Sequence, residues 1–379
     1  MRASASIRPY LLAALIDAEE GLAGRPALVV AADDVGARDL ARALGAYLAP
    51  RRVRYYPSRG TGYESHLAPP PHLVGLRIGA LDALTATPEP GAEPAAVVAS
   101  AVALAEAVPD ASLRPEGFVL HRGEEVDLGD VSELLVEAGY EHTDQVEERG
   151  QFAVRGGILD VFPATEERAA RLELFGDEIE SIRWFSTFTQ RSLGEAERIE
   201  LDPAAELALE HRELAEIASE DGERPDIAEL LPMESFRAPL ELIGDETVIL
   251  LAAAEEIPAA LRDHWEDVTT AMHDADARHL YVNVAEPLAE RAAMRILRPS
   301  ADPPAAEAEL SEPQASGRPA KPGASAERWV FRAQAPVSAA RSISEAESQL
   351  ERSSRSGYRV VVAFAGRGEA ERASTRLRL

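Results

Sequence analysis

Lysine is the residue type whose placement decides most about chemistry in this chain, because phosphate-binding loops and Schiff-base enzymes both depend on it. Only one of the 39 basic side chains is a lysine, Lys321. A phosphate-binding loop needs a lysine that follows a glycine-rich turn of backbone donors and precedes Ser or Thr. Pro319 and Pro322 flank Lys321, and proline has no backbone N–H to donate. The sequence therefore predicts that a Walker A site is absent, and it argues nearly as firmly against lysine Schiff-base chemistry.

Other catalytic and metal-binding patterns are missing or weak. The chain has no cysteine, which excludes thiolate nucleophiles, disulfides and cysteine zinc sites. The segment 273–279 holds two histidines and two aspartates, but their spacing matches no ligand set and Arg278 would repel a cation. Residues 366–368 read Gly-Arg-Gly, as at the start of a dinucleotide turn, but Glu371 stands where the third glycine belongs. We predict no catalytic residue, no metal ligand and no cofactor in this chain.

A basic and aromatic cluster is a candidate for nucleic-acid binding. Arginines that alternate with aromatic residues can hold a phosphate backbone and stack bases. The residues of this patch are Arg51, Arg52, Arg54 and Tyr55, with Tyr56 and Arg59 beside them. The formal net charge of the whole chain is −27, which opposes long-range attraction of nucleic acid. Direct DNA binding is therefore kept as an alternative function and is not the main prediction.

A predicted hairpin around residues 155–185 is the stronger candidate for binding. A strand period of two places Leu172 and Leu174 on one face, which the core requires. The other face then receives three different side chains, Arg171, Glu173 and Phe175. An aromatic beside arginine on an open face is typical of interface hot spots, and Arg155 could join that face. The alternative, equally weighted, is that a neighbouring helix covers Phe175.

The elements that must position these residues form two kinds of structure. Buried-strand patterns and helix patterns alternate in the first part and return after about residue 203, which predicts a parallel α/β sheet. The predicted elements are a helix at 10–20, strands at 27–32, 53–56 and 247–252, and a helix that Asp33 or Asp34 caps and that ends at Leu48. Between these parts, a helix at 131–138, a strand at 151–162 with a bulge at Gly156–Gly157, and a hairpin at 171–185 predict a small α+β module.

Composition supports several domains. The acidic excess concentrates between residues 114 and 300, and residues 299–327 hold six prolines and no aromatic residue. The predicted division is an α/β domain, first part (1–113), an inserted α+β domain (114–202), the second α/β part (203–298), a linker (299–327) and the incomplete start of a further domain (328–379). No apolar run reaches the length of a membrane span, and no signal peptide opens the chain. We expect a cytoplasmic protein with no membrane partner.

Two ordered runs of residues resemble a known module. Residues 145–163 read Gln-Val-Glu-Glu-Arg-Gly-Gln-Phe-Ala-Val-Arg-Gly-Gly-Ile-Leu-Asp-Val-Phe-Pro. Residues 171–183 read Arg-Leu-Glu-Leu-Phe-Gly-Asp-Glu-Ile-Glu-Ser-Ile-Arg, and Thr-Gln-Arg-Ser follows at 189–192. This pattern resembles the UvrB-type interaction domain, which the excision-repair protein UvrB shares with the bacterial transcription-repair coupling factors (Mfd). The resemblance covers roughly residues 10–300, as a degenerate UvrB- or helicase-like domain split by the interaction domain.

The resemblance implies a partner and a place in DNA repair. The module would bind the damage-recognition protein UvrA through Arg155, Arg171 and Phe175, with Arg183 as a weaker addition. The chain would then be a non-catalytic docking region of transcription-coupled nucleotide-excision repair that recruits UvrA to stalled RNA polymerase. In this family, the polymerase-binding domain and an ATP- and Mg-dependent DNA translocase motor lie further on, so RNA polymerase and DNA are expected partners of segments beyond Leu379.

This sequence differs from UvrB in several places, and the differences indicate that the coupling factors are the better match of the two relatives. The Walker A loop of UvrB has no counterpart here, and the stretch 55–84 is too short and too poor in tyrosine for its DNA-binding hairpin. Residues 251–253, Leu-Ala-Ala, offer no carboxylate for magnesium. Two other functions stay open: a direct DNA-binding module, and a fragment of an ATP-dependent translocase or helicase.

Overall fold

The computed structural model describes residues 1–18, 22, 24–60, 69–86, 93–209, 235–271, 280–298, 330–331 and 343–357. The chain divides into two compact units, Met1–Arg332 and Ala333–Leu379. The described part of the second unit contains the helix α11 (Ile343–Arg355). The predicted linker at 299–327, the segment 273–279 and the glycines at 366 and 368 lie outside the described residues.

A five-stranded parallel sheet forms the centre of the first unit, in the order β16-β15-β2-β4-β3. Its strands are β2 (Ala27–Ala31), β3 (Val53–Tyr56), β4 (Ala96–Ser100), β15 (Val248–Leu251) and β16 (Ala292–Arg295). The three central strands are buried at every position, and their nearly continuous apolar sequences suit strands that are covered on both faces. This sheet confirms the predicted α/β class.

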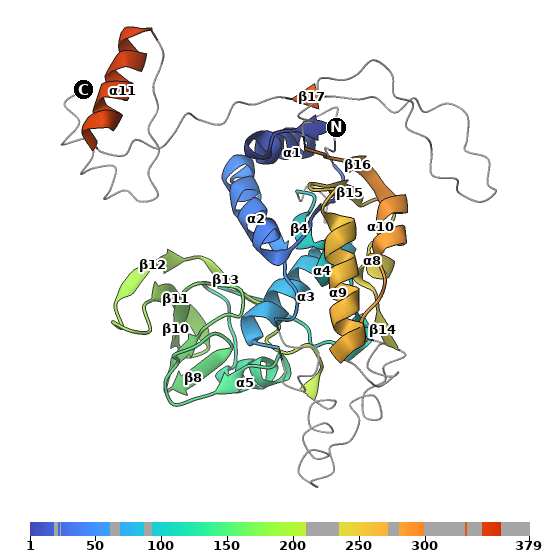
Figure 1. Cartoon of the computed structure of the whole chain (residues 1–379). Coiled ribbons are helices and arrows are strands. Elements are labelled where there is room, and N and C mark those ends of the chain that lie inside the picture. The colour runs from blue at the N-terminus through green and yellow to red at the C-terminus, as the bar shows by residue number, and fades with distance from the viewer. Residues whose placement is uncertain are drawn as a thin grey trace, which may run out of the picture. The chain divides into compact units, whose positions relative to one another are not determined.

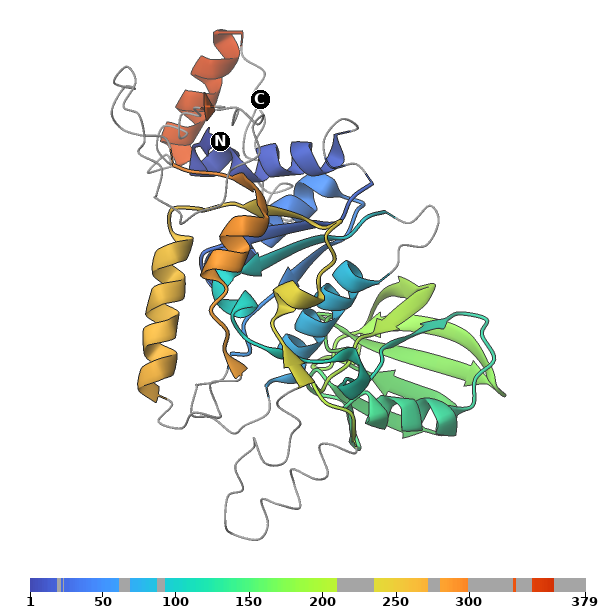
Figure 2. The same cartoon turned by 90° about the vertical axis from the view of Figure 1, so that its right-hand side faces the viewer.

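Helices cover both faces of the parallel sheet (Figures 1 and 2). On one face, α1 (Arg8–Asp17) and α2 (Asp34–Leu48) bury Leu12 and Leu44 against Val29 and its neighbours. The other face is covered by α3 (Pro71–Thr85), α4 (Ala101–Leu104), α8 (Pro239–Leu242), α9 (Ile257–Ala271) and α10 (Ala285–Arg291). Short elements complete the unit: β1 (Arg2–Ala3) pairs with β17 (Val330–Phe331), β5 (Val108–Pro109) pairs with β14 (Phe236–Arg237), and η1 (Ala5–Ile7) and η2 (Ala111–Leu113) are single turns.

A second sheet occupies the middle of the sequence. It has six strands in the order β12-β11-β10-β9-β8-β7, antiparallel except for the pair β7–β8. The strands are β7 (Glu141–His142), β8 (Gln151–Arg155), β9 (Ile158–Val161), β10 (Ala169–Phe175), β11 (Glu178–Phe185) and β12 (Ser192–Ala196). One face packs on α5 (Leu128–Glu137) and on the antiparallel pair β6 (Phe118–His121) and β13 (Arg198–Leu201). We call this part, residues 118–201, the inserted module.

The start of α5 differs from the prediction. The helix was predicted to begin at Val131, but it begins at Leu128, because the carboxylate of Asp127 accepts the backbone N–H groups of Gly129 (2.6 Å) and Asp130 (3.3 Å). The predicted end is confirmed. Gly139 has a φ of +94°, and its N–H and that of Tyr140 satisfy the last carbonyls of the helix.

The predicted bulge at Gly156–Gly157 is wrong. These two glycines form the turn of a tight hairpin, because Arg155 at the end of β8 pairs with Ile158 at the start of β9. Gly156 has a φ of +61°, which the turn requires and which a glycine adopts without strain. The sheet does contain an irregularity, between β10 and β11, where the register shifts after Glu173. Paired glycines fit a bulge and a turn equally well, so the sequence alone did not separate the two.

Close packing joins the inserted module to α3. A Cβ added at Gly75 would lie 2.7 Å from the Cβ of Ala164 and 3.2 Å from the carbonyl oxygen of Pro203. One turn later, a Cβ at Gly79 would lie 2.8 Å from the carboxylate of Asp202. The two glycines are four residues apart and therefore share a face of α3. The module reaches the body of the unit at this glycine face.

Replacing Gly75 with Ala is therefore expected to lower the free energy of unfolding by about 1–3 kcal/mol, although alanine favours helices. Gly45 in α2 is the matched control, because a Cβ there meets nothing within 4 Å. Gly45→Ala is expected to stabilise the chain by up to about 1 kcal/mol. Urea unfolding of both variants measures the two effects. Equal stabilisation by both substitutions would show that the junction at Gly75 is loosely packed.

Candidate functional site

The face of the second sheet that points away from α5 carries the predicted binding residues. Residues directly paired across strands share a face. Arg171 pairs with Asp160 on β9 and with Arg183 on β11, and Ile158 pairs with both Glu173 and Arg155. The strand alternation then places Phe175 on this face as well. We call this surface the open face; it brings together all four residues predicted to contact a partner.

The alternative interpretation, in which a neighbouring helix covers Phe175, is wrong. Phe175 is the last residue of β10, at the tip of the β10–β11 hairpin, and it is 81% exposed. Leu172 points to the opposite face and is fully buried among residues of α5 and the neighbouring strands. Gly176 continues the chain with a φ of +66°, which turns it tightly after Phe175. The hairpin thus presents a phenyl ring to solvent.

Arg171 is engaged within the module. Its Nε and Nη2 donate to the two carboxylate oxygens of Asp160, at 2.6 and 2.8 Å, and Nη2 lies 3.4 Å from Oε1 of Gln190. Its guanidinium also stacks 4.9 Å from the centre of the Phe185 ring. The hydrogen bond to Asp160 raises the pKa of Arg171. This two-point pair is a fixed part of the open face, and it leaves Arg171 few donors for a partner.

The two other arginines are less confined. Arg183 forms an ion pair with Glu173 on the neighbouring strand, and both side chains keep over a third of their surface exposed. Arg155 donates to the backbone oxygen of Asp144 and is exposed. Exposed ion pairs contribute little to stability, so these guanidinium groups can exchange their present acceptors for new ones at low cost.

The difference between Arg171 and Arg183 predicts different effects on stability. Arg171→Met leaves the buried carboxylate of Asp160 without its partner and is expected to cost about 1–3 kcal/mol of unfolding free energy. Arg183→Met removes an exposed pair and is expected to cost less than about 1 kcal/mol. Chemical denaturation of the two variants tests this. A cost for Arg183→Met that equals or exceeds that of Arg171→Met would contradict the assignment.

The structure does not assemble the predicted nucleic-acid patch as an open basic surface. Arg52 and Arg54 both pair with Glu200 of β13, and burial lowers the pKa of Arg54. The guanidinium of Arg51 donates to the backbone oxygen of Pro94 at 2.5 Å. Tyr55 donates to the backbone oxygen of Asp34 at 3.0 Å, and burial raises its pKa. These side chains join parts of the chain to one another.

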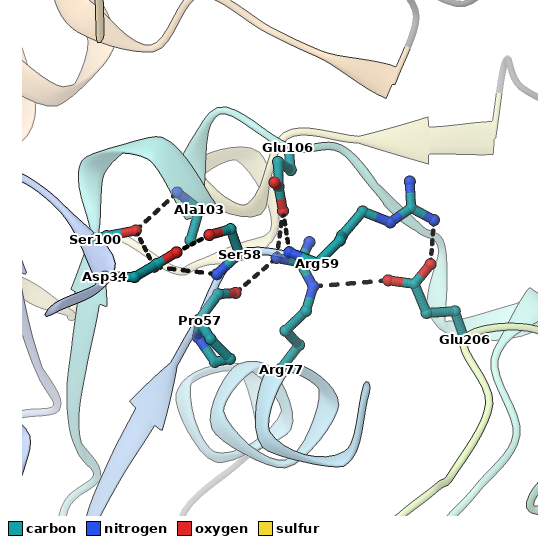
Figure 3. Close-up of polar contacts among 9 residues, drawn as sticks. All are labelled: Asp34, Pro57, Ser58, Arg59, Arg77, Ser100, Ala103, Glu106 and Glu206. Atoms are coloured by element: carbon teal, nitrogen blue, oxygen red, sulfur yellow. Dashed lines mark hydrogen bonds and ion pairs between the residues drawn. The ribbon is translucent and has the colours of Figure 1, made fainter. Parts of the chain in front are cut away.

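Carboxylates and hydroxyls occupy the carboxyl end of the parallel sheet. In open α/β sheets, ligands bind where connections from adjacent strands leave in opposite directions. Here that point lies between β2 and β4, since β2 leads through α2 to β3 while β4 leads across to β15 on the other side. Asp34 accepts from Ser100 Oγ (2.7 Å) and from the N–H (3.2 Å) and hydroxyl of Ser58, as Figure 3 shows. Asp33 caps α2 by accepting from Gly36 N–H at 2.7 Å.

A buried charge cluster lies next to these residues, and the sequence analysis did not find it. Arg77 of α3 is 1% exposed; its Nη1 lies 2.7 Å from both Oε2 of Glu106 and the backbone oxygen of Pro57 (Figure 3). Its Nε lies 3.6 Å from Glu206, which also pairs with Arg59. Burial, partly offset by Arg77, raises the pKa of Glu106. The sequence feature that could have revealed this cluster is Arg77 itself, an arginine inside an otherwise apolar stretch of α3.

No group of three or more His, Asp or Glu side chains in the described ranges is arranged to hold a metal ion. Within the same ranges, no helix combines the length and apolar character needed to cross a membrane.

Comparisons with known proteins match the module and more than half of the chain. The family described as the UvrB interaction domain matches residues 118–207. A transcription-repair-coupling factor of Bacillus subtilis is 28% identical over 250 residues, 62% of this chain and 21% of that protein. One from Myxococcus xanthus is 35% identical over 222 residues, 56% of this chain and 18% of that protein.

A second kind of relative matches a shorter part. The UvrABC system protein B of Streptococcus uberis is 40% identical over 114 residues, 29% of this chain and 16% of that protein. The chain thus spans about a fifth of the length of the curated relatives it matches. Residues 118–207 match the UvrB interaction domain, and over more than half of its length the chain is similar to the transcription-repair-coupling factors, which confirms the resemblance found in the sequence.

Proposed function

We propose that this chain is a docking region that binds UvrA and thereby recruits it during transcription-coupled nucleotide-excision repair. The match to the UvrB interaction domain and the similarity to coupling factors support this proposal. The single observation that carries it is Phe175, an aromatic side chain left 81% exposed at the tip of a hairpin. Aromatic anchors that become buried on binding dominate the energetics of protein interfaces, and an exposed ring beside arginines has the composition of such an anchor.

The residues around Phe175 support the role of an interface. Arg155 and Arg183 lie on the same open face as the ring and hold exchangeable, exposed contacts. Their guanidinium forks can pair with carboxylates of UvrA around the anchor. The Arg171–Asp160 pair is already fixed by two hydrogen bonds, so little side-chain freedom is lost at this pair when a partner binds. Phe175 is thus the energetic centre, and Arg155 and Arg183 form its charged rim.

We infer that this chain performs no catalysis itself. A helix N-terminus at the end of a parallel strand is where nucleotide phosphates bind in related folds. At α2 this place holds the carboxylates of Asp33 and Asp34, which would repel a phosphate and which satisfy the local donors themselves. Neither ATP nor magnesium is required for the docking role. The translocase or helicase alternative and the DNA-binding alternative have no comparable observation in their favour.

The proposal extends to the organisation and setting of the chain. Residues 114–202 would act as the docking domain, and residues 1–113 and 203–298 as the α/β body that holds it. Contacts with RNA polymerase and with DNA, in the cytoplasm, would be made by domains outside the fifth of the relatives' length that this chain spans.

A titration of purified UvrA with the 379-residue chain tests the proposal. We expect saturable binding that needs no added nucleotide, no ATP hydrolysis by the chain alone, and no strong, salt-sensitive binding of the chain to duplex DNA. Absence of UvrA binding would refute the docking function. ATP turnover by the purified chain would favour the motor fragment, and tight, salt-sensitive DNA binding would favour the nucleic-acid module.

A further inference from the structure

We infer that the turn between β11 and β12 is a second apolar contact point for UvrA, with Phe188 as its anchor; this inference rests on the proposed function. Among the large hydrophobic side chains of the described residues, Phe188 is the most exposed, at 96%. Leu193, which the register shift of β12 leaves without a direct partner on β11, is 50% exposed close by in the sequence. Phe175, Phe188 and Leu193 therefore give strands β10–β12 an apolar surface at both ends.

Hydrogen bonds fix the backbone of the turn that carries Phe188. Ser186 donates its N–H to the oxygen of Arg191 at 3.0 Å, and it accepts from the N–H of Gln190 at 2.7 Å. The hydroxyl oxygen of Ser186 accepts from Thr189 N–H at 3.2 Å, and the Gln190 amide donates to the oxygen of Thr187 at 2.8 Å. An exposed loop gains nothing in solubility from a phenylalanine, but a turn whose backbone is already fixed loses little further backbone entropy when a partner covers it.

Backbone strain marks the same turn. Gln190 has a φ of +57°, and it is the one non-glycine residue with positive φ in the described part of the chain. Residues with a Cβ adopt this conformation only where their surroundings hold them, and such positions gather at functional sites. Here the two side-chain contacts of Gln190 hold it, one to Thr187 and one to Arg171. These contacts therefore hold the loop that carries Phe188 in a conformation that would otherwise be unfavourable.

The contact between Gln190 and Arg171 makes the turn continuous with the open face. Arg171 lies four residues before Phe175 on β10, and its Nη2 lies 3.4 Å from Gln190. Phe185 at the end of β11 pairs with Ala169, six residues before Phe175, so with a rise of about 3.4 Å per residue the two ends of the β10–β11 pair lie roughly 20 Å apart. Between them lie the ion pairs Arg171–Asp160 and Arg183–Glu173. The partner surface that fits has two apolar pockets separated by a polar band that can pair with arginine and carboxylate.

The partner that covers this turn is UvrA, because the turn adjoins the surface proposed to bind UvrA. Phe175 lies on the face that points away from the core covered by α5, and the turn that carries Phe188 contacts the same face through Gln190 and Arg171. A typical interface buries about 800 Å² per partner, which a single hairpin tip does not supply. Including the β11–β12 turn extends the contact along the whole length of β11.

Titrations of UvrA with four forms of the 379-residue chain test the inference: the native chain, Phe188→Ala, Phe175→Ala and the control Leu134→Ala. Leu134 is 46% exposed on α5, the helix that covers the opposite face. We expect Phe188→Ala to weaken binding at least fivefold and Leu134→Ala to leave it unchanged. Because Phe188 is almost fully exposed, its replacement should not change the thermal midpoint of the chain.

The outcomes separate this inference from the proposed function. If Phe175→Ala weakens binding and Phe188→Ala binds like the native chain, the second contact point is refuted and the docking function stands. If the native chain does not bind UvrA, both are refuted. As a second measurement, a photoreactive benzoylphenylalanine at position 188 should cross-link to UvrA, whereas the same group at position 134 should not; equal cross-linking from both positions would also refute the inference.

Discussion

Arg77→Met is expected to lower the free energy of unfolding by about 3–5 kcal/mol, the largest loss we predict for one side chain. Methionine fills much of the same volume, so the loss comes from charge and not from a cavity. Without Arg77, the carboxylates of Glu106 and Glu206 stay buried with only Arg59 to balance them. Since domains are stable by about 5–15 kcal/mol, this one change would remove a large share of the total.

Urea unfolding followed by circular dichroism measures this loss. Arg38→Met on the exposed side of α2 is the matched control, and we expect it to change stability by no more than about 0.5 kcal/mol. Adding Glu106→Gln to Arg77→Met should recover part of the loss, because the amide carries no charge that must be paired. A cost below about 1 kcal/mol for Arg77→Met would mean that the cluster contributes little to the fold.

Phe175→Ala is expected to weaken UvrA binding by at least thirtyfold, about 2 kcal/mol, without loss of stability. The ring is already exposed in the free chain, so its removal costs the fold almost nothing, while the complex loses its central apolar contact. Titration calorimetry with UvrA gives the affinity, and thermal unfolding gives the stability.

The Arg183 and Arg171 variants complete this test. Arg183→Met should weaken binding less than Phe175→Ala, because rim charges contribute mainly to association rate and to its salt dependence. Arg171→Met should lower both the free energy of unfolding and the affinity for UvrA, since it removes the hydrogen bonds to Asp160 on the open face. Native affinity in Phe175→Ala would show that the binding surface lies elsewhere on the chain.

The parts of the fold that could be predicted are those whose local sequence shows a pattern of apolar residues typical of a strand or a helix. Strands β2 and β15 were found because a strand covered on both faces is apolar throughout. Strand β3 was found as a second short run, although it contains Arg54 and lies at the edge of the sheet. The alternation in β10 also showed which side chains leave the core, and so it identified the face of Phe175. Strand β4 was not predicted, although its sequence Ala-Val-Val-Ala-Ser has the same apolar character.

The parts that could not be predicted depend on contacts between distant residues. The partner of Arg171 is Asp160, and that pairing follows from the register of β9 and β10, which hairpin geometry decides. The basic patch looked open in the sequence, but Glu200, nearly 150 positions away, pairs with two of its arginines. The cluster around Arg77 likewise gathers Glu106 and Glu206 from separate segments. The spacing of residues along the sequence does not show which distant side chains come into contact.

Amide hydrogen exchange of the 379-residue chain, with and without UvrA, tests the central claim most directly, because it reports where the partner sits. We predict slower exchange on UvrA binding in the β8–β9 and β10–β11 hairpins, at residues 155–158 and 173–178, with α1 and α2 unchanged. Protection confined to the α/β body, or none in these two hairpins at saturating UvrA, would contradict the account.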